Sequence, residues 1–261
     1  MLITRKNLKK LQKAIPSAWL YLLQDIHSYL ITKWILDHHT KDLTISQKSV
    51  MVFSPHQDDE TFGCGGMIAQ KREQGIEVNV VFITDGRGGI GSEPDKNKVI
   101  EIRKQESLNA LKILGVDTSA IHFLDQEDGT LKELSIEAKQ QTINQISELI
   151  KLYQPGEIYV PHYQDCHRDH EATYQLVKDA ITQTHITTEL IQYPIWLLWR
   201  LPIFFSLKLS DISPAYRLSL ASVKAKKQQA IFAYSSQIEN LHLGFIKRFL
   251  NLDEIFFRSK N

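Results

Sequence analysis

Ionisable residues crowd into a short stretch that directly follows an apolar run. The run at 50–53 predicts a buried strand, and a Ser-Pro pair then turns the chain into His56, Asp58, Asp59 and Glu60. Adjacent carboxylates repel each other. A site that holds Asp58 beside Asp59 therefore binds a cation or raises the pKa of one carboxyl group. The stretch points to a metal site.

A second ionisable cluster follows another short apolar run, at 158–160. Residues 165–170 read Asp-Cys-His-Arg-Asp-His, which places His167 and His170 three residues apart at the start of a predicted helix. Side chains at this spacing share one side of a helix. Two histidines and one carboxylate are a common catalytic zinc set with one position open for water. Because sites in parallel sheets form beyond the carboxyl ends of strands, the two clusters can meet in one crevice.

Each cluster also has a purely structural explanation. Histidines three apart often lie on solvated helix faces, and the acidic residues Asp58, Asp59 and Glu60 could instead favour a helix N-terminus through its dipole. Cys64 and Cys166 flank the clusters, but small buried residues beside a turn explain them better than zinc ligands do. The joint occurrence of both clusters after separate strands favours the metal site.

Hydrophobic periodicity in the rest of the chain predicts alternating strands and helices, an α/β pattern with a βαβ unit near its start. We expect strands over 50–53, 78–84, 121–124 and 158–160, and helices over 67–74, 98–114, 136–153 and 171–181. A glycine-rich loop at 87–91 lacks the pattern of a phosphate-binding loop, so we interpret it as a substrate loop.

Residues 1–47 differ from the remainder. Five cations and no anions precede residue 17, and apolar residues that include Trp19 and Trp34 then recur at helical spacing. We expect an amphipathic helical extension over 1–47, followed by one catalytic domain over 48–261. The helix either packs on that domain or makes a peripheral membrane contact through residues 1–35. The apolar stretch 190–207 is interrupted by proline and arginine, which argues against a membrane span.

The composition narrows the functional classes. A length of 261 residues, with 43% hydrophobic and 23% charged residues, fits one substantial core. The net charge of +1 and the lack of a basic-aromatic stripe argue against nucleic-acid binding. Two cysteines provide no disulfide framework, and the N-terminus lacks a convincing signal peptide. We expect a cytoplasmic protein, with the inner face of the membrane as the place of any peripheral contact.

Both clusters resemble signatures of the PIG-L/LmbE-like zinc deacetylases. Residues 55–60, Pro-His-Gln-Asp-Asp-Glu, resemble the family's P/A-H-P-D-D-E, and residues 165–170 resemble its D-x-H-x-D-H. Further elements extend the similarity over about residues 48–240: Thr84-Asp85-Gly86, Arg103 with Glu106, Ala110 and Leu114-Gly115, and Lys227 with Ala230 and Ser236-Gln237. Two positions depart from the pattern, because Gln57 replaces the family proline and Tyr234 stands where a histidine often precedes Ser-Gln.

By position, the resemblance implies roles for individual residues. The implied zinc ligands are His56, Asp59 and His170. Asp58 would be the general base, and His167 would stabilise the oxyanion or protonate the leaving amine. Asp169 would orient His167, and Arg103 would contact the substrate. These roles follow from the resemblance and not from the spacing alone.

The resemblance implies a Rossmann-like fold, with helices on both faces of a mostly parallel sheet, and a zinc-dependent deacetylase of N-acetylated amino sugars such as N-acetylglucosamine conjugates. Alternatives are an amidase of a thiol-sugar conjugate and a catalytically silent carbohydrate-binding relative. Intact Asp58 and His167 argue against the silent relative, because binding needs neither residue. The aromatic stretch from Tyr193 to Phe204 could border the crevice, and Arg103 could pair with a phosphate. We therefore expect a lipid- or phosphate-linked substrate.

Overall fold

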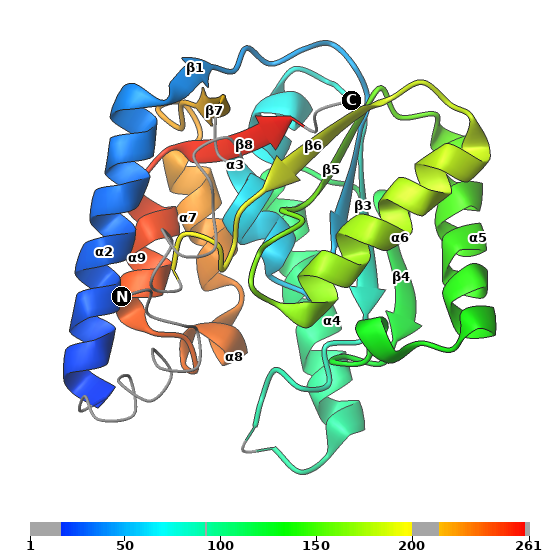
Figure 1. The fold of residues 1–261 in the computed structure, drawn as a ribbon, viewed down its shortest axis with the longest axis horizontal. Coiled ribbons are helices and arrows are strands. Elements are labelled where there is room, and N and C mark those ends of the chain that lie inside the picture. Colours follow the sequence, from blue (N-terminus) through cyan, green and yellow to red (C-terminus); the bar gives the residue numbers. More distant parts are fainter. Residues whose placement is uncertain (1–16, 92, 200–213, 259–261) are drawn as a thin grey trace, which may run out of the picture.

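The computed structural model describes residues 17–91, 93–199 and 214–258, and these form an α/β fold (Figure 1). Its single described sheet has the strand order β1-β7-β8-β6-β5-β2-β3-β4. The strands are β1 Thr40–Asp42, β2 Val50–Ser54, β3 Val78–Thr84, β4 Ile121–Gln126, β5 Glu157–Pro161, β6 Glu189–Tyr193, β7 Ala215–Leu218 and β8 Glu254–Arg258. The helices are α2 Ser17–His38, α3 Asp59–Glu73, α4 Lys96–Leu114, α5 Ile136–Tyr153, α6 Arg168–Thr184, α7 Lys224–Phe232, α8 Ser235–Ile238 and α9 Leu243–Asn251, with short 3₁₀ turns at Thr118–Ala120 and Leu131–Glu133. The predicted fold class is confirmed.

The direction of chain progression reverses between two central strands of the sheet. From β2 the chain continues to β3 and β4 on one side, whereas β5 and β6 lie on the other side. All these pairs are parallel, and only β8 runs antiparallel to its neighbours β6 and β7. Ligands of open α/β sheets bind where such a reversal separates the carboxyl ends of adjacent strands. The two ionisable clusters follow β2 and β5, the strands on either side of this point.

Two hydrophobic cores flank the sheet, and β2 contributes alternately to both. Val50 and Val52 face a core built with α3, α4, α7 and α9, and Met51 and Phe53 face a core built with α5 and α6 (Figure 1). Successive side chains of a strand point to opposite faces. All five residues of β2 are buried, so this strand is a rigid support for the turn that follows it.

The helix after the first cluster begins earlier than predicted. We expected residues 67–74, but α3 begins at Asp59 and runs through Gly63 and Gly66. A Cβ atom at Gly63 would overlap the Tyr193 ring, and one at Gly66 would overlap Leu220. These glycines therefore allow close packing of the helix and do not end it. The cost in helix propensity, about 1 kcal/mol per glycine, misled the prediction.

A buried ion pair fixes α3 to the elements that follow much later in the chain. The Lys227 ammonium group donates to the Phe62 carbonyl over 2.8 Å and lies 2.6 Å from the Glu254 carboxylate. Glu254 also accepts the backbone N–H groups of Gly66 and Met67. Lys227 belongs to α7 and Glu254 to β8, so the pair links three elements beneath the first cluster.

The N-terminal helix packs on the rest of the fold with one face. Ile31 and Ile35 of α2 join a third core, which includes Leu198 and Ile255. The next element, β1, pairs with β7 at the edge of the same sheet. Residues 1–16 lie outside the described residues, and the division at residue 47 stays a prediction. No helix in the described parts of the chain is long and apolar enough to cross a membrane.

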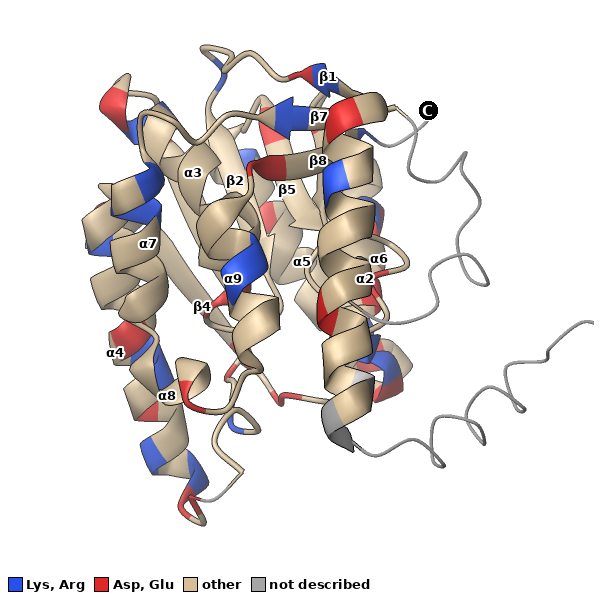
Figure 2. Cartoon of the chain, turned by 90° about the vertical axis from the view of Figure 1, so that its left-hand side faces the viewer, with Lys and Arg blue, Asp and Glu red and all other residues tan. Residues whose placement is uncertain are grey.

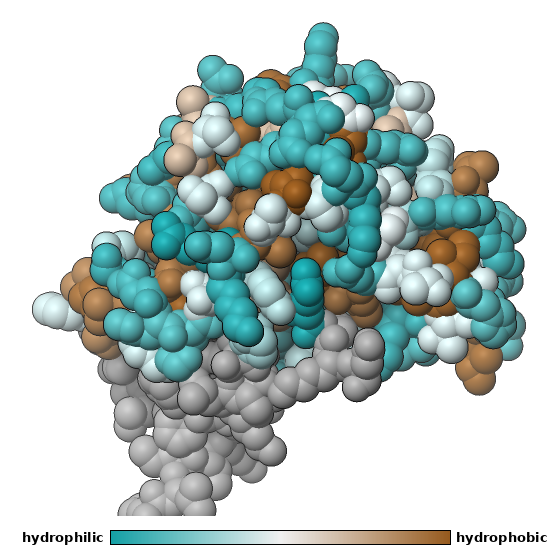
Figure 3. Space-filling model, turned by 90° about the horizontal axis from the view of Figure 1, so that it is seen from above, coloured by the Kyte–Doolittle hydropathy of each residue, from teal (hydrophilic) through white to brown (hydrophobic). Residues whose placement is uncertain are grey.

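The face at the amino ends of β2, β3 and β5 is mostly hydrophilic, with apolar side chains scattered across it (Figure 3). Both ionisable clusters lie at the opposite edge, where these strands end.

Candidate active site

The two predicted clusters meet, and three of their side chains converge on one point. His56 lies in the turn after β2, Asp59 begins α3, and His170 lies in the first turn of α6. Asp59 Oδ2 is 3.1 Å from His56 Nδ1 and 3.2 Å from His170 Nε2. All three side chains are buried, and the contact of His170 Nε2 with Asp59 Oδ2 falls short of hydrogen-bond geometry. A buried ring nitrogen without a hydrogen bond, beside a carboxylate and a second imidazole, fits a metal ligand.

The other ring nitrogen of each histidine is held by a carboxylate. His170 Nδ1 is 2.7 Å from Asp165 Oδ2. His56 Nε2 is 3.1 Å from Asp128 and 3.2 Å from Asp169. Histidines that ligate metals usually donate their second N–H to a carboxylate or carbonyl, which fixes the tautomer and the ring orientation. Both histidines therefore have the surroundings expected of metal ligands.

Two of these supporting carboxylates had no role in the sequence analysis. Asp165 stood within the second motif, and its partner could not be known before the fold was seen. Besides His170, Asp165 accepts the backbone N–H groups of Ile195, Trp196 and Leu197. Asp128 lies in the loop after β4 and accepts the Gly88 N–H over 3.0 Å. The only signal for Asp128 was an acidic turn placed directly after a predicted strand.

Other combinations of ligand atoms are also close enough to hold an ion. One group comprises His56, His167 and His170, and another comprises His56, Asp128 and Asp169; within each group the ligand atoms lie within 4.8 Å of one another. The first group adds His167 to the predicted histidines. The second uses the carboxylates that face His56 Nε2.

The local electrostatics favour positive charge at the point of convergence. Burial opposes the charged form of Asp59, yet His170 and His56 outweigh it and hold the pKa of Asp59 well below its usual value. Burial likewise opposes protonation of His170, but Asp59 and Asp165 raise its pKa to about 9. Protons and metal ions compete for the same lone pairs. The potential that favours a proton on His170 therefore also favours a bound cation.

Asp58 lies beside this point in a strained backbone conformation. Its φ is 146°, a region that costs a residue other than glycine about 1–3 kcal/mol. Its backbone N–H donates to Glu60 Oε2 over 3.1 Å, and its carboxylate lies 3.5 Å from Arg103 Nη2. Burial raises the pKa of Asp58 to about 8, and the attraction of Arg103 only partly offsets this. A buried carboxyl group of raised pKa is typical of catalytic acids and bases.

Arg103 supports the two loops that carry the site. It is buried and donates to the carbonyl groups of Gln57, over 2.7 Å, and Gly86, over 3.1 Å. A Cβ at Gly89 would overlap the guanidinium group, so the loop can cover Arg103 only with glycine there. Arg103 lines the pocket beside Asp58. Its predicted contact with the substrate stays a prediction, because these bonds occupy much of the guanidinium group.

Gln57 and Tyr234, the two residues that depart from the family pattern, both form hydrogen bonds beside the candidate site. Gln57 Nε2 donates to the Thr84 carbonyl over 2.8 Å, which ties the turn after β2 to the end of β3. Tyr234 is fully buried, and its hydroxyl group donates to Glu60. Glu60 in turn accepts the Asp58 N–H. Both residues therefore help to fix the turn that carries Asp58.

Glu106 connects the remaining family elements. Its carboxylate accepts the Ser236 N–H over 2.8 Å and the hydroxyl groups of Ser235, over 3.0 Å, and Ser236, over 2.7 Å. These three hydrogen bonds join α4 to α8, two helices that are more than a hundred residues apart in the sequence. The Arg-x-x-Glu and Ser-Gln patterns therefore meet in one contact.

His167 caps α6 next to the convergent point. Its ring centroid is 5.0 Å from that of His56 and 4.7 Å from that of His170. His167 Nδ1 accepts the Asp169 N–H over 3.3 Å, so the neutral ring carries its proton on Nε2. Burial, together with His170 and His56, lowers the pKa of His167 to about 4. At neutral pH this side chain is therefore a neutral hydrogen-bond donor.

The Asp169 carboxylate contacts the His56 ring, and its role in orienting His167 stays a prediction. It lies 3.2 Å from His56 Nε2 and accepts the N–H groups of Gly129 and Leu131. The structure connects Asp169 to His167 through the backbone amide and connects its side chain to His56.

A pocket of about 290 Å³ opens over these groups and has two unlike walls. The polar wall contains Gly88 and Gly89 of the predicted substrate loop and the following ionisable residues: His56, Asp58, Asp59, Arg103, Asp128 and His167. The apolar wall consists of Phe62, Ile195, Trp196, Leu241 and Phe245. Trp196 stacks on Phe245 with ring centroids 4.6 Å apart. Part of the predicted aromatic stretch therefore borders the crevice, whereas Phe204 lies outside the described residues.

Comparisons with known proteins agree with this geometry. The family model PIG-L, described as GlcNAc-PI de-N-acetylase, matches residues 51–181, half of the chain. An uncharacterized deacetylase of Escherichia coli, YaiS, is 28% identical over 198 residues, which are 74% of this chain and 98% of that protein. The 4-oxalmesaconate hydratase of Pseudomonas putida is 26% identical over 147 residues, 54% of either chain.

A solved structure supports the fold. The N,N'-diacetylchitobiose deacetylase of Pyrococcus horikoshii, complexed with its inhibitor MPG, superposes with a TM-score of 0.61 at 20% identity and covers 93% of this chain and 91% of that one. The matched range 51–181 contains β2, β5 and both ionisable clusters, which the structure brings together at one sheet edge. The chain therefore belongs to the PIG-L family, and it is an amide-hydrolysing enzyme.

Proposed function

We propose that this protein is a zinc-dependent hydrolase that removes the N-acetyl group from an amino sugar or its conjugate. The observation that carries the proposal is the position of Asp59 Oδ2, which lies 3.1 Å from His56 Nδ1 and 3.2 Å from His170 Nε2, with Asp58 beside them in the same pocket. The family description, which names N-acetylglucosamine in its substrate, supports the choice of amino sugar.

His56, Asp59 and His170 would hold the zinc ion. The donor set of two imidazoles and one carboxylate suits catalytic zinc, and the carboxylates behind both imidazoles suit ligands of this kind. A bound Zn²⁺ supplies Lewis acidity, which polarises an amide carbonyl and makes water nucleophilic at neutral pH. The two other potential donors, Asp58 and His167, then remain for the chemical steps.

The positive charge of a bound zinc ion would favour the ionised form of Asp58. The carboxylate would then accept the proton of the attacking water, whose oxygen bonds to the carbonyl carbon of the amide. The N–H at His167 Nε2 would donate to the carbonyl oxygen as negative charge develops on it, and such donors stabilise the transition state. When the C–N bond breaks, the protonated Asp58 would return its proton to the amine. Acetate and the free amino sugar leave, which balances one water consumed.

The test is the release of acetate from N-acetylglucosamine conjugates by the zinc-loaded protein. One relative of this chain is named a 4-oxalmesaconate hydratase, so hydration is the reaction to be separated from hydrolysis. Hydration releases no acetate and no amine, so quantifying both products separates the two reactions. Binding of the conjugate without release of either product would favour a silent carbohydrate-binding protein.

The exposed face of α2 supports a second part of the proposal, a peripheral contact with the inner face of the membrane. Opposite its buried residues, α2 exposes a stripe of large apolar side chains: Trp19, Leu22, Leu23, Ile26, Tyr29, Leu30 and Trp34. Few charged residues interrupt this helix (Figure 2). Five cations precede it in the sequence, and anionic lipid surfaces attract such segments.

Replacing Ile26 and Leu30 with glutamate should weaken sedimentation with phosphatidylglycerol vesicles at low salt by about 100-fold or more. Burial of each side chain contributes about 1.5–3 kcal/mol. The matched control replaces Ile136 and Leu152 of α5, which are 85% and 70% exposed, with glutamate and should sediment like the unmodified protein. Equal sedimentation of both double variants would rule out the contact. Hydrolysis of a soluble substrate should stay unchanged in both.

The apolar wall of the pocket suggests a lipid-linked amino sugar. We expect an N-acetylglucosaminide with an octyl aglycone to have a kcat/KM about tenfold above that of the methyl glycoside, because even one buried methylene group can contribute that much. Trp196→Ala should reduce the ratio of the kcat/KM values of the octyl and methyl glycosides. The control Trp34→Ala changes a tryptophan of α2 that lies outside the pocket, and it should leave this ratio unchanged. Equal kcat/KM values for the two glycosides in the unmodified protein would contradict the prediction.

A further inference from the structure

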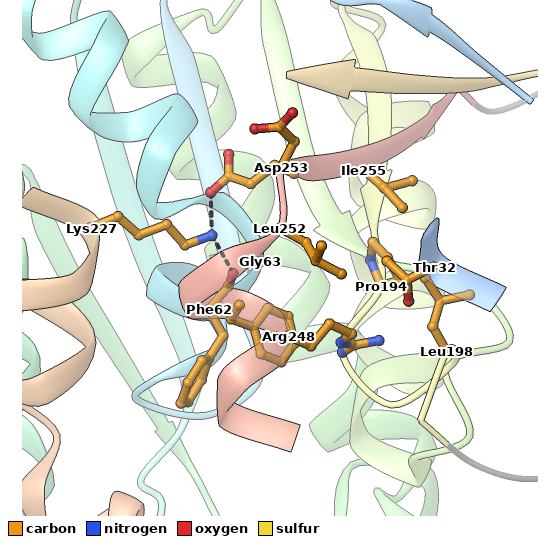
Figure 4. A pocket seen from close by; sticks show the side chains of 12 residues that line it. Thr32, Phe62, Gly63, Pro194, Leu198, Lys227, Arg248, Leu252, Asp253 and Ile255 are labelled. Carbon is orange, nitrogen blue, oxygen red and sulfur yellow. Dashed lines mark hydrogen bonds and ion pairs between the residues drawn. The ribbon is translucent and has the colours of Figure 1, made fainter. Parts of the chain in front are cut away.

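A second, smaller cavity shares Phe62 with the pocket over the candidate active site. Its walls come from α2, α3, α7, α9, β8 and the segment after β6, and its volume is about 30 Å³ (Figure 4). A cavity needs at least about 10–15 Å³ to hold one water molecule. This cavity therefore has room for one or two water-sized groups, which favours a monatomic ion as its occupant.

Two buried side chains at this cavity have unused hydrogen-bonding atoms. Arg248 is 7% exposed, and its Nε and Nη1 have no hydrogen-bond partner among the described residues. Thr32 is 3% exposed, and its Oγ1 is equally unpartnered. Figure 4 shows the guanidinium group pointing away from Lys227, toward Thr32 and Leu198. An unmade hydrogen bond of a buried group costs about 1–3 kcal/mol, and more when the group is charged.

One hydrogen bond and one contact with an aromatic ring hold the Arg248 side chain at the cavity. Nη2 donates to the Ile195 carbonyl, and the guanidinium carbon lies 4.2 Å from the centroid of the Phe249 ring. Burial lowers the pKa of Arg248 to about 10, so the group stays protonated at neutral pH. The guanidinium group has no acceptor atoms, and it therefore offers an unpaired N–H donor and a positive charge to the cavity.

Carboxylates near the cavity already have their own partners. Glu254 binds Lys227 and two backbone N–H groups of α3. Asp253 binds Arg217, over 2.7 Å, and the Leu220 N–H. Asp165 attracts Arg248 electrostatically, but its two oxygens already bind His170 Nδ1 and the backbone N–H group of Ile195. None of these groups supplies the acceptor that Arg248 Nε and Nη1 and Thr32 Oγ1 lack.

We propose that Arg248 and Thr32 bind a small monatomic anion, chloride or bromide, in this cavity. An anion accepts from Thr32 Oγ1 and from one of the two unpaired guanidinium N–H groups, and it offsets the charge of the guanidinium group. Charge-assisted hydrogen bonds of this kind are stronger than neutral ones, which favours an anion over water at the same position.

The anion site connects to the proposed metal site through the backbone. Arg248 holds the Ile195 carbonyl, and the N–H groups of Ile195, Trp196 and Leu197 hold Asp165, which contacts His170 Nδ1. An anion that fixes Arg248 therefore fixes the support of a metal ligand. This consequence rests on the proposed function, whereas the anion site itself does not.

The direct test is the ³⁵Cl NMR line width of chloride in the presence of the full chain. We expect the protein to broaden the chloride line and bromide to compete with that broadening. Thr32→Val keeps the volume of the side chain but removes its hydroxyl group, and it should weaken halide binding about tenfold or more. The matched control is Thr188→Val, which removes another buried, unpartnered hydroxyl group far from the cavity and should bind like the unmodified protein. Equal broadening by both variants would overturn the proposal.

Crystals grown in bromide give an independent measurement. We expect an anomalous peak between Arg248 and Thr32, and its absence at saturating bromide would overturn the proposal even if line broadening occurred elsewhere on the protein. Arg248→Met should abolish the peak, but it also removes the bond to Ile195, so Thr32→Val is the cleaner variant. Neither measurement uses activity or zinc. A failure of the proposed hydrolase function would therefore leave the outcome of this test unchanged.

Discussion

Asp58→Asn is expected to lower kcat by ~10²–10⁴-fold while the protein keeps its zinc. The loss of a positioned general base typically costs this much. Asparagine preserves the shape of the side chain and tolerates positive φ values better than most residues, so it suits the 146° at this position. The amide cannot accept the proton of water as a carboxylate does. The measurement is steady-state acetate release, with zinc content determined on the same samples.

The matched control for this experiment is Asp125→Asn. Asp125 is an exposed aspartate near the end of β4 that also has positive φ, and it pairs with Lys104 outside the pocket. The Asp125→Asn variant should retain the kcat of the unmodified protein. A near-native kcat in Asp58→Asn would show that another group accepts the proton. Loss of zinc in that variant would instead mean that Asp58 is a ligand and not the base.

His170→Ala is expected to remove stoichiometric zinc. The variant deletes one of three proposed protein ligands and leaves Asp59 and His56 without the third donor that completes the set. Asp165→Asn should act more mildly, because it only weakens the support of the ring; such changes typically reduce metal affinity by ~10–100-fold. Elemental analysis and competition with a chelator of known affinity measure both effects, and circular dichroism reports whether the variants fold.

His185→Asn is the control for the histidine variants. His185 ends α6 with a φ of 58°, is exposed and lies far along the helix from the first turn that carries His170. Asparagine is well tolerated in this left-handed conformation. This variant should bind zinc like the unmodified protein. Undiminished zinc in His170→Ala would refute the ligand assignment, and the groups around His167 or Asp128 would then become the next candidates.

Much of the fold could be predicted because local patterns agree with the tertiary structure. The strand over 78–84 and the helix over 136–153 have the predicted bounds, since a fully buried apolar run and a capped amphipathic helix each leave a clear periodicity. The predicted start of α3 was wrong, because the helix begins at Asp59 and not at residue 67. Its glycines lower helix propensity, and only the positions of Tyr193 and Leu220 show that side chains would not fit there.

The sequence by itself determined that two ionisable clusters follow separate strands, and hence that a metal site at a sheet edge was the best interpretation. It could not determine which groups stand behind the ligands. Asp128 contacts His56 only because the strands β4 and β2 end at the same edge of the folded sheet, whereas Asp165 contacts His170 within one motif, five residues along the chain. Contacts between residues far apart in sequence leave no local periodicity, so they are invisible without the fold.

Tertiary structure alone also decided which residues of the late part of the chain reach the pocket. In the aromatic stretch that begins with the last residue of β6, Trp196 lines the crevice, whereas Tyr193 and Leu198 are buried in the cores. All three are apolar, and hydrophobicity predicts burial without saying which surface a side chain meets. The buried Arg248 likewise reads in sequence as an ordinary surface cation of an amphipathic helix. Its unpaired donors became apparent only where α2, α9 and the turn at Ile195 enclose it.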